Sequence, residues 1–120
     1  MGLDQYAYKT LEPITSVDFN DPEDSEMIKD WRKHPNLHGF MVKLYDSKGG
    51  SGEMNCDNLQ LTLADLNDLE IQVDEGTLPY TNGCFFGTSE PEDRIPDLEF
   101  IYKAKLCINE GYNIFYSAWW

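Results

Sequence analysis

The chain has 120 residues, of which 41% are hydrophobic and 13% aromatic, enough to bury a core. This length suits one domain, so we expect a single folded unit over residues 1–120 and exclude enzymes that close two lobes around a nucleotide. Asp and Glu number 22 against 9 Lys and Arg, which gives a net charge of −13. A surface this acidic repels phosphate, which argues against direct binding of nucleic acid or of an anionic membrane.

The N-terminal third is expected to hold two extended segments separated by a loop. Residues 3–9 alternate with period two and are rich in tyrosine, a pattern typical of a β-strand. Residues from about 10 to 26 contain two prolines and several acids, which predicts a solvated, mobile acidic loop. Residues 27–33 are expected to be extended, because Pro35 disfavours helical geometry at His34.

Two helices are expected in the middle of the chain. An apolar stripe at helical spacing predicts a helix over about 35–47. Its members are Leu37, Phe40, Met41 and Leu44. Residues 53–61 form a weak strand or an extended connector. Thr62 and Asp65 then have the spacing of a capping box, so a second helix is expected over about 63–75.

The C-terminal part is expected to hold a long loop, a helix and a closing strand. The loop, residues 77–91, is rich in glycine and aromatic side chains, contains a brief strand at about 84–86 and is a fair place for function. The helix covers about 93–110, and residues 112–120 are aromatic and β-rich. The stripe that predicts this helix is Asp97, Phe100, Ile101, Ala104, Leu106, Cys107 and Ile108.

The order of these elements predicts an α+β fold: a small, mostly antiparallel sheet with about three helices on one face. The closing strand ends in two tryptophans, Trp119 and Trp120. Alternation along a strand predicts that one of them packs inward and that the other contacts another chain. A second copy of the chain is therefore a candidate partner.

The most polar stretch begins at Trp31 and places Arg32, Lys33, His34 and His38 in a cationic spot on an acidic protein. Such a spot suits an anion or an acidic partner, because Arg holds carboxylates and phosphates through two parallel hydrogen bonds. The structural alternative is that Arg32 pairs with a native carboxylate and that the imidazoles cap a helix or lie at the surface. The candidate residues for binding a ligand or partner are Trp31, Arg32, Lys33, His34, His38 and Trp120.

If the chain is an enzyme, its candidate catalytic residues are His34, His38, Asp4 and Cys56. Histidine titrates near neutral pH and serves as acid or base, and Cys56 is a nucleophile if a histidine lies within reach. The alternative for Cys56 is a half-buried small apolar residue. The histidines lack the paired spacing of metal ligands, and the glycines after Lys48 lack a Gly-Lys-Ser ending, so we predict no metal and no cofactor.

The acidic surface has three interpretations. It provides solubility, it docks a basic partner, or it mimics nucleic acid by placing spaced carboxylates in a phosphate-binding groove. The row of carboxylates for such mimicry comprises Asp65, Asp68, Glu70, Asp74 and Glu75, extended by Glu90, Glu92, Asp93, Asp97 and Glu99.

The cysteines and the hydropathy pattern bear on location. Cys56, Cys84 and Cys107 are irregularly spaced, which predicts no disulfide framework, and free thiols suit a reducing cytoplasm. The first residues lack the basic region and apolar run of a signal peptide, and no apolar stretch approaches the roughly 18 residues of a membrane span. We expect a cytoplasmic protein without membrane contact.

Six stretches spread over nearly the whole chain carry a family resemblance. They are MGLDQY at 1–6, WRKHPNLHGFM at 31–41, NC at 55–56, LPYTNGCFFG at 78–87, DLEFI at 97–101 and IFYSAWW at 114–120. Together they resemble a family of small proteins from tailed bacteriophages, notably phages of cyanobacteria, with looser relatives in bacterial genomes. The resemblance implies a phage origin and a location in the cytoplasm of the infected host cell, and it implies no activity.

Proteins of that family often carry the label phosphoglycerate kinase, which the sequence excludes as chemistry. Such a kinase needs two lobes and a basic patch, whereas this chain has 120 residues, a charge of −13 and no phosphate loop. Our first hypothesis is a non-enzymatic phage accessory protein that binds a host protein. The alternatives are a small enzyme or anionic-ligand-binding protein using Arg32, His34 and His38, and an acidic mimic of nucleic acid that inhibits a host DNA-binding or defence protein.

Overall fold

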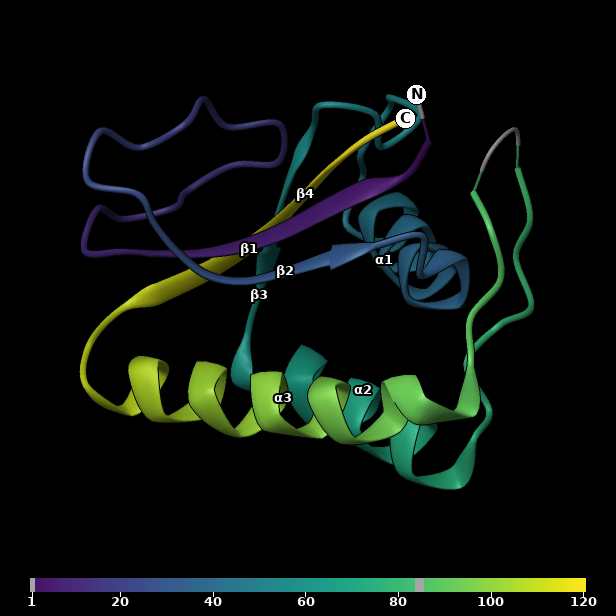
Figure 1. Cartoon of the computed structure of the whole chain (residues 1–120). Coiled ribbons are helices and arrows are strands. Elements are labelled where there is room, and N and C mark those ends of the chain that lie inside the picture. The colour runs from purple at the N-terminus through teal and green to yellow at the C-terminus, as the bar shows by residue number, and fades with distance from the viewer. Residues whose placement is uncertain (1, 84–85) are drawn as a thin grey trace.

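The computed structural model describes residues 2–83 and 86–120 and places four strands in a sheet. The strands are β1 (Asp4–Thr10), β2 (Glu26–Arg32), β3 (Asn58–Leu61) and β4 (Asn113–Trp119). Their order is β2-β1-β4-β3, and every pair is antiparallel. The first and last strands in sequence are therefore neighbours in the middle of the sheet, as Figure 1 shows.

The helices lie against one face of this sheet (Figure 1). They are α1 (Pro35–Ser47), α2 (Leu63–Glu75) and α3 (Arg94–Asn109), and a 3-10 turn, η1 (Pro91–Asp93), leads into α3. The fold class predicted from the sequence, α+β with an antiparallel sheet and three helices, is confirmed. None of the described helices is long and apolar enough to cross a bilayer.

Local sequence signals explain where the helices begin and end. Pro35 occupies the first helical position of α1, where its missing N–H costs nothing. Thr62 and Asp65 form the expected capping box at the start of α2, and Gly76 ends that helix in the left-handed conformation with φ 70°. The expected strand at 53–61 is shorter than predicted, since Met54 and Cys56 both have positive φ and break extended pairing.

The core lies between the sheet and the helices. On this face Tyr116 of β4 is fully buried, and its ring packs near the rings of Trp31 from β2 and His38 from α1. The indole of Trp31 meets the ring of Phe100 from α3 edge-on, with centroids 4.8 Å apart. Aromatic side chains from β2, β4, α1 and α3 thus meet at one place, directly beside the polar groups described below.

The segment between β1 and β2 covers part of the opposite face of the sheet. Phe19 packs edge-on against Phe115 of β4, with ring centroids 5.3 Å apart. Asn58 of β3 donates hydrogen bonds to the Phe19 carbonyl and to Asp21, and the Tyr45 hydroxyl of α1 donates to Asp18. The loop expected between the first two strands is present and solvated, and Phe19 within it gives the second face of the sheet an apolar cover. Of the strand expected at 84–86, residues 84 and 85 lie outside the described part of the chain.

Candidate functional site

The backbone around His34 is held in an unusual conformation. Lys33, just after β2, has φ 57°, a left-handed geometry that is rare for a residue with a side chain, and its N–H donates to the Leu3 carbonyl at 2.8 Å. The amide of Gln5 holds the next residue on both sides: its Oε1 accepts from the His34 N–H (2.9 Å) and its Nε2 donates to the His34 carbonyl (3.0 Å). His34 is thereby turned from the edge strand into the interior.

The imidazole of His34 forms a buried pair with Asp97. Nε2 lies 2.7 Å from Asp97 Oδ2, and the other carboxylate oxygen, Oδ1, accepts from the Trp31 indole N–H at 2.9 Å. The two side chains are almost fully buried, since His34 is 3% and Asp97 2% exposed. Asp97 also lies in the first turn of α3, where the helix dipole favours negative charge. An aspartate with this environment orients an imidazole firmly.

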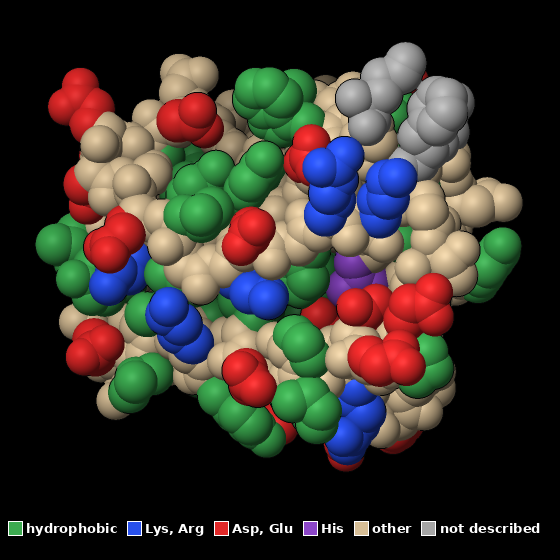
Figure 2. Space-filling view, viewed as in Figure 1, with side chains coloured by type: hydrophobic (Ala, Val, Ile, Leu, Met, Phe, Trp, Pro, Cys, Tyr) green, Lys and Arg blue, Asp and Glu red, His purple; other side chains and the backbone are tan. Residues whose placement is uncertain are grey.

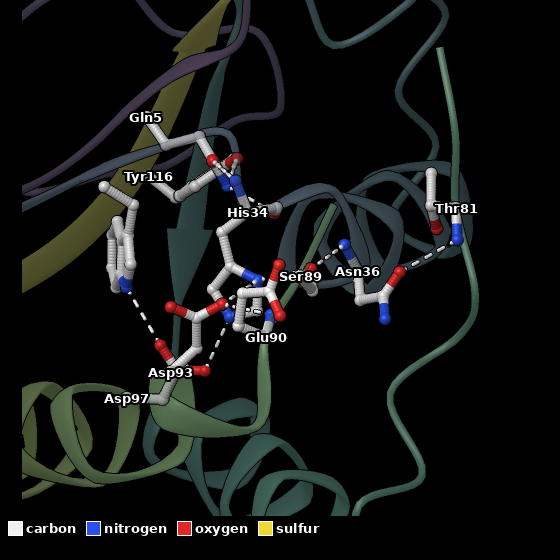
Figure 3. Close-up of polar contacts among 10 residues, drawn as sticks. Gln5, His34, Asn36, Thr81, Ser89, Glu90, Asp93, Asp97 and Tyr116 are labelled. Carbon is white, nitrogen blue, oxygen red and sulfur yellow. Dashed lines mark hydrogen bonds and ion pairs between the residues drawn. The ribbon is translucent and has the colours of Figure 1, made fainter. Parts of the chain in front are cut away.

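The second ring nitrogen of His34 faces a serine. Nδ1 lies 2.7 Å from Ser89 Oγ, and the same oxygen accepts a hydrogen bond from the Asn36 backbone N–H at 3.0 Å (Figure 3). Because the Asp97 carboxylate only accepts, we assign a ring proton to Nε2, and Nδ1 is then placed to accept from the Ser89 hydroxyl. Nδ1 also lies 3.7 Å from Asp93 Oδ2. The chain of bonds therefore runs from Ser89 through His34 to Asp97.

These groups line a cavity of about 450 Å³. Its walls come from the start of α1, the C-terminal end of α2, the segment after residue 88 and the first turn of α3. The carboxylate-bearing residues that line it are Asp74, Glu75, Glu90, Asp93 and Asp97. The Arg94 side chain also lines it and forms an ion pair with Asp74. Figure 2 shows a histidine in a hollow of this face, with Lys and Arg side chains on one side and Asp and Glu side chains on the other.

A serine hydroxyl, an imidazole and a carboxylate in this order form the set that serine hydrolases use. The ring is turned relative to the usual arrangement, because here Nδ1 faces the serine and Nε2 faces the aspartate. Both ring nitrogens are equivalent in the acid–base role, since a proton held on one leaves the other as the base. The arrangement is therefore able to take a proton from Ser89 while Asp97 stabilises the resulting imidazolium.

The structure separates the residues that the sequence analysis grouped together. Arg32 is exposed and pairs with Asp4 of the neighbouring strand at 3.7 Å, and Lys33 is exposed beside Gly87. Trp31 is buried against α3 and contributes to the site through its hydrogen bond to Asp97. Of this group, His34 alone lines the cavity that holds the serine.

His38 belongs to a different network. Gln5 Nε2 donates to the Tyr116 hydroxyl (3.2 Å), which lies 2.9 Å from His38 Nδ1 and is assigned as the donor to it. Burial lowers the pKa of His38 to about 4, so this ring is neutral at pH 7, and burial raises the pKa of Tyr116, so its hydroxyl stays protonated. His38 lines a second cavity, of about 380 Å³, with Phe86 and Trp120.

Two further expectations need correction. Both terminal tryptophans are exposed, Trp119 at 62% and Trp120 at 42%, because β4 ends at Trp119 and alternation does not continue through Trp120. The Trp120 ring still packs edge-on against Phe86 and His38. Cys56 is exposed rather than half-buried, and its backbone N–H donates to the Ala118 carbonyl of β4 at 2.7 Å.

Sequence reasoning missed Ser89, Asp97 and Asn36 as site residues. A signal was present for Asp97, because an aspartate in the apolar stripe of a helix predicts a buried carboxylate that needs partners. For Ser89 the only signal was its position in a loop rich in glycine and aromatic side chains. Asn36 had none, because its partners Thr81 and Ser89 are 45 and 53 residues away and only the fold identifies them.

The described residues contain no group of three or more His, Cys, Asp or Glu side chains that converge as metal ligands. Comparison of the chain with protein-family models, with curated proteins and with solved structures gives no match. The function is therefore argued from the geometry of the site.

Proposed function

We propose that the protein is a small serine hydrolase that cleaves esters. Ser89 is the nucleophile, His34 the general base and Asp97 the group that orients His34. The observation that carries the proposal is the pair of 2.7 Å contacts, from His34 Nδ1 to Ser89 Oγ and from His34 Nε2 to Asp97 Oδ2, at the wall of a cavity. Contacts of this length fall within the reach needed for proton transfer.

The reaction proceeds in two halves. Ser89 Oγ attacks the ester carbonyl carbon while its proton moves to His34 Nδ1, and the carbon–oxygen bond to the alcohol breaks as Nδ1 returns the proton to the leaving oxygen. Water then attacks the acyl-serine, gives one proton to Nδ1 and releases the carboxylic acid as the serine oxygen regains that proton. Throughout, the Nε2 proton stays between His34 and Asp97, so the imidazolium that forms is balanced by a buried carboxylate.

Strain beside the site supports a functional assignment. Lys33 keeps a left-handed φ of 57° next to His34. The chain also passes close to Lys33 at Gly87, where a side-chain Cβ would lie only 2.8 Å from the Lys33 Cβ. Such geometry costs about 1–3 kcal/mol and persists where the surrounding structure enforces it. In a purely structural interpretation, Ser89 caps the start of α1 and the His34–Asp97 pair ties α1 to α3. That interpretation predicts no activated serine, which the test below measures.

The test is covalent labelling by an alkyl fluorophosphonate, which loses fluoride when an activated serine attacks its phosphorus. We expect one phosphonyl adduct per chain, located on Ser89 by tandem mass spectrometry of the wild-type protein, and turnover of p-nitrophenyl acetate. Ser89→Ala abolishes the adduct and lowers turnover by at least about 10³-fold. Ser51→Ala, at an exposed serine outside the cavity, is the matched control and keeps both. Absence of labelling, or an adduct on another serine, contradicts the proposal.

The hypotheses of phage origin, of host-protein binding and of nucleic-acid mimicry stay predictions. Fewer unpaired carboxylates are left for mimicry than the sequence suggested, because three acids of α2 form ion pairs. These pairs are Asp65–Lys48, Glu70–Lys105 and Asp74–Arg94. A pull-down from host lysate at low and high salt tests both binding hypotheses, since electrostatic complexes weaken as screening rises.

A further inference from the structure

Asn36 bonds to the proposed nucleophile through its backbone N–H and carries a side-chain amide that lines the same cavity. We infer that the Asn36 side-chain amide donates to the oxygen that becomes negative when Ser89 attacks a carbonyl. This inference rests on the proposed hydrolase function and adds a catalytic residue to it. Two contacts of Asn36 support this role: the bond of its backbone N–H to Ser89 and the bond of its Oδ1 to the Thr81 N–H.

The position of Asn36 relative to the nucleophile is fixed by a direct bond. Its backbone N–H donates to Ser89 Oγ at 3.0 Å, and its side chain lines the same cavity as Ser89 and His34. The Asn36 side chain is therefore attached to a backbone that contacts the attacking atom, Ser89 Oγ. The start of α1 also directs its positive dipole end toward this point, which favours developing negative charge there.

The orientation of the amide is fixed as well. The Thr81 N–H donates to Asn36 Oδ1 at 3.0 Å, which leaves the NH₂ group, on the side away from Thr81 in Figure 3, as the part able to donate. Among the described residues that NH₂ group has no hydrogen-bond partner. An amide held in this way does not have to rotate when negative charge develops on the substrate oxygen. Oxyanion donors are effective because they are oriented before the reaction.

The backbone donor that many serine hydrolases use is already occupied. In those enzymes the N–H of the residue after the nucleophile contributes to the oxyanion hole. Here that residue is Glu90, and its N–H donates to Asp93 Oδ2 at 2.8 Å in the capping arrangement of η1. The Glu90 N–H is therefore not free for the oxyanion, and Asn36 offers an amide side chain on a residue whose backbone N–H bonds to the nucleophile.

The test measures the second-order rate of fluorophosphonate labelling and the kinetics of p-nitrophenyl acetate hydrolysis in Asn36→Ala and Asn36→Asp. The aspartate keeps the acceptor for Thr81 and suits a helix N-terminus, so it preserves the fold while removing the NH₂ donors. We expect both variants to lose about 10²-fold or more in labelling rate and in kcat, with KM nearly unchanged, because an oxyanion donor acts in the transition state. Asn67→Ala, at an exposed position of α2, is the control and keeps the wild-type rate.

The outcomes separate this inference from the proposed function. If the wild type is labelled on Ser89 and both Asn36 variants react at the wild-type rate, the oxyanion role is overturned and the hydrolase stands. If the loss appears in KM rather than in kcat, Asn36 binds substrate and the oxyanion role is again overturned. If the wild type is not labelled, the hydrolase itself is overturned, and the inference with it.

Discussion

Two histidines four residues apart have opposite chemical environments. His34 contacts a buried carboxylate and a serine hydroxyl at 2.7 Å each, whereas the Nδ1 of His38 faces the neutral phenol of Tyr116. Gln5 connects the two, since one amide holds the His34 backbone and donates to Tyr116. Of the two, His34 is therefore the residue to which the proposed function assigns proton transfer, and His38 is a neutral polar group of the core.

The carboxylate of Asp97 sets the proton position on His34. In Asp97→Asn the amide NH₂ faces Nε2, which moves the ring proton to Nδ1 and removes the acceptor for the Ser89 proton. We expect the rate of fluorophosphonate labelling to fall by about 10³–10⁴-fold and the free energy of unfolding to fall by about 1–3 kcal/mol. Labelling kinetics and urea denaturation measure the two effects. Glu99→Gln, at an exposed position of α3, is the control, and labelling of Asp97→Asn at the wild-type rate contradicts the prediction.

The buried His38 makes stability depend on pH. The pKa of His38 is about 4 in the folded state against an ordinary pKa of 6.5, so the unfolded chain binds more protons between these two pH values. Stability from this group is complete above about pH 7 and is lost as pH falls toward 4. Between pH 7.5 and 4.5 we expect the free energy of unfolding of the wild type to fall by about 2–3 kcal/mol more than that of His38→Gln. Urea denaturation at both pH values checks this, and equal decreases in the two proteins would contradict it.

At the scale of elements, the site depends on how one loop docks on α1. The segment after α2 contacts α1 through the Thr81 N–H and through Ser89, both bonded to Asn36. Gly39 of α1 permits the close approach, because a Cβ there would lie 1.9 Å from Thr81 Oγ1. A helix glycine costs about 1 kcal/mol relative to alanine in an exposed helix, so its use here reflects the packing of the loop.

Gly39→Ala tests that docking. The added methyl displaces Thr81, so we expect a loss of about 1–3 kcal/mol in the free energy of unfolding, the usual range for overpacking. The labelling rate at Ser89 falls as well, because Asn36 and the loop lose their alignment. Thr81→Ala in the Gly39→Ala background removes the clashing Oγ1 and restores part of the stability, and Asp46→Ala on the exposed side of α1 is the control. A Gly39→Ala protein as stable as the wild type would show that the loop does not rest on α1.

At the scale of the whole molecule, the acidic charge continues into the wall of the cavity. The net charge is −13, and the cavity wall adds Glu75, Glu90 and Asp93, while Arg94 is engaged by Asp74. Cationic substrates are drawn to such a surface and anionic substrates are repelled. The phosphorylated ligands suggested by the cationic spot at Arg32 and Lys33 are therefore poor candidates for this cavity.

This electrostatic preference is measurable with esters of one acyl group. We expect kcat/KM for an ester with a quaternary ammonium group to exceed that for an ester with a carboxylate by about tenfold or more at low salt. The ratio falls toward one in about 0.5 M salt, because screening then acts within a few ångströms. A neutral isosteric ester is the control and shows little dependence on salt. A ratio that does not change with salt would contradict the electrostatic explanation.

The secondary structure and fold class were accessible from the sequence because their causes are local. The helix α2 begins at a capping box and ends at Gly76, and the expected range of 63–75 matches the observed one. The helix expected at 35–47 is likewise observed with those bounds. Periodicity and caps act between residues at most a few positions apart, so one sequence suffices to recognise them.

The candidate site was not accessible in the same way. His34 was identified because its residue type titrates near neutral pH, but it was grouped with Arg32 and His38, its neighbours in the chain. Its actual partners, Ser89 and Asp97, are 55 and 63 residues away, and Asn36 and Ser89 are 53 apart. Composition and local pattern alone determined the charge, the elements and the fold class. The tertiary structure alone decided which hydroxyl and which carboxylate reach the imidazole, because only packing of the loop, α1 and α3 brings such distant groups within hydrogen-bonding distance.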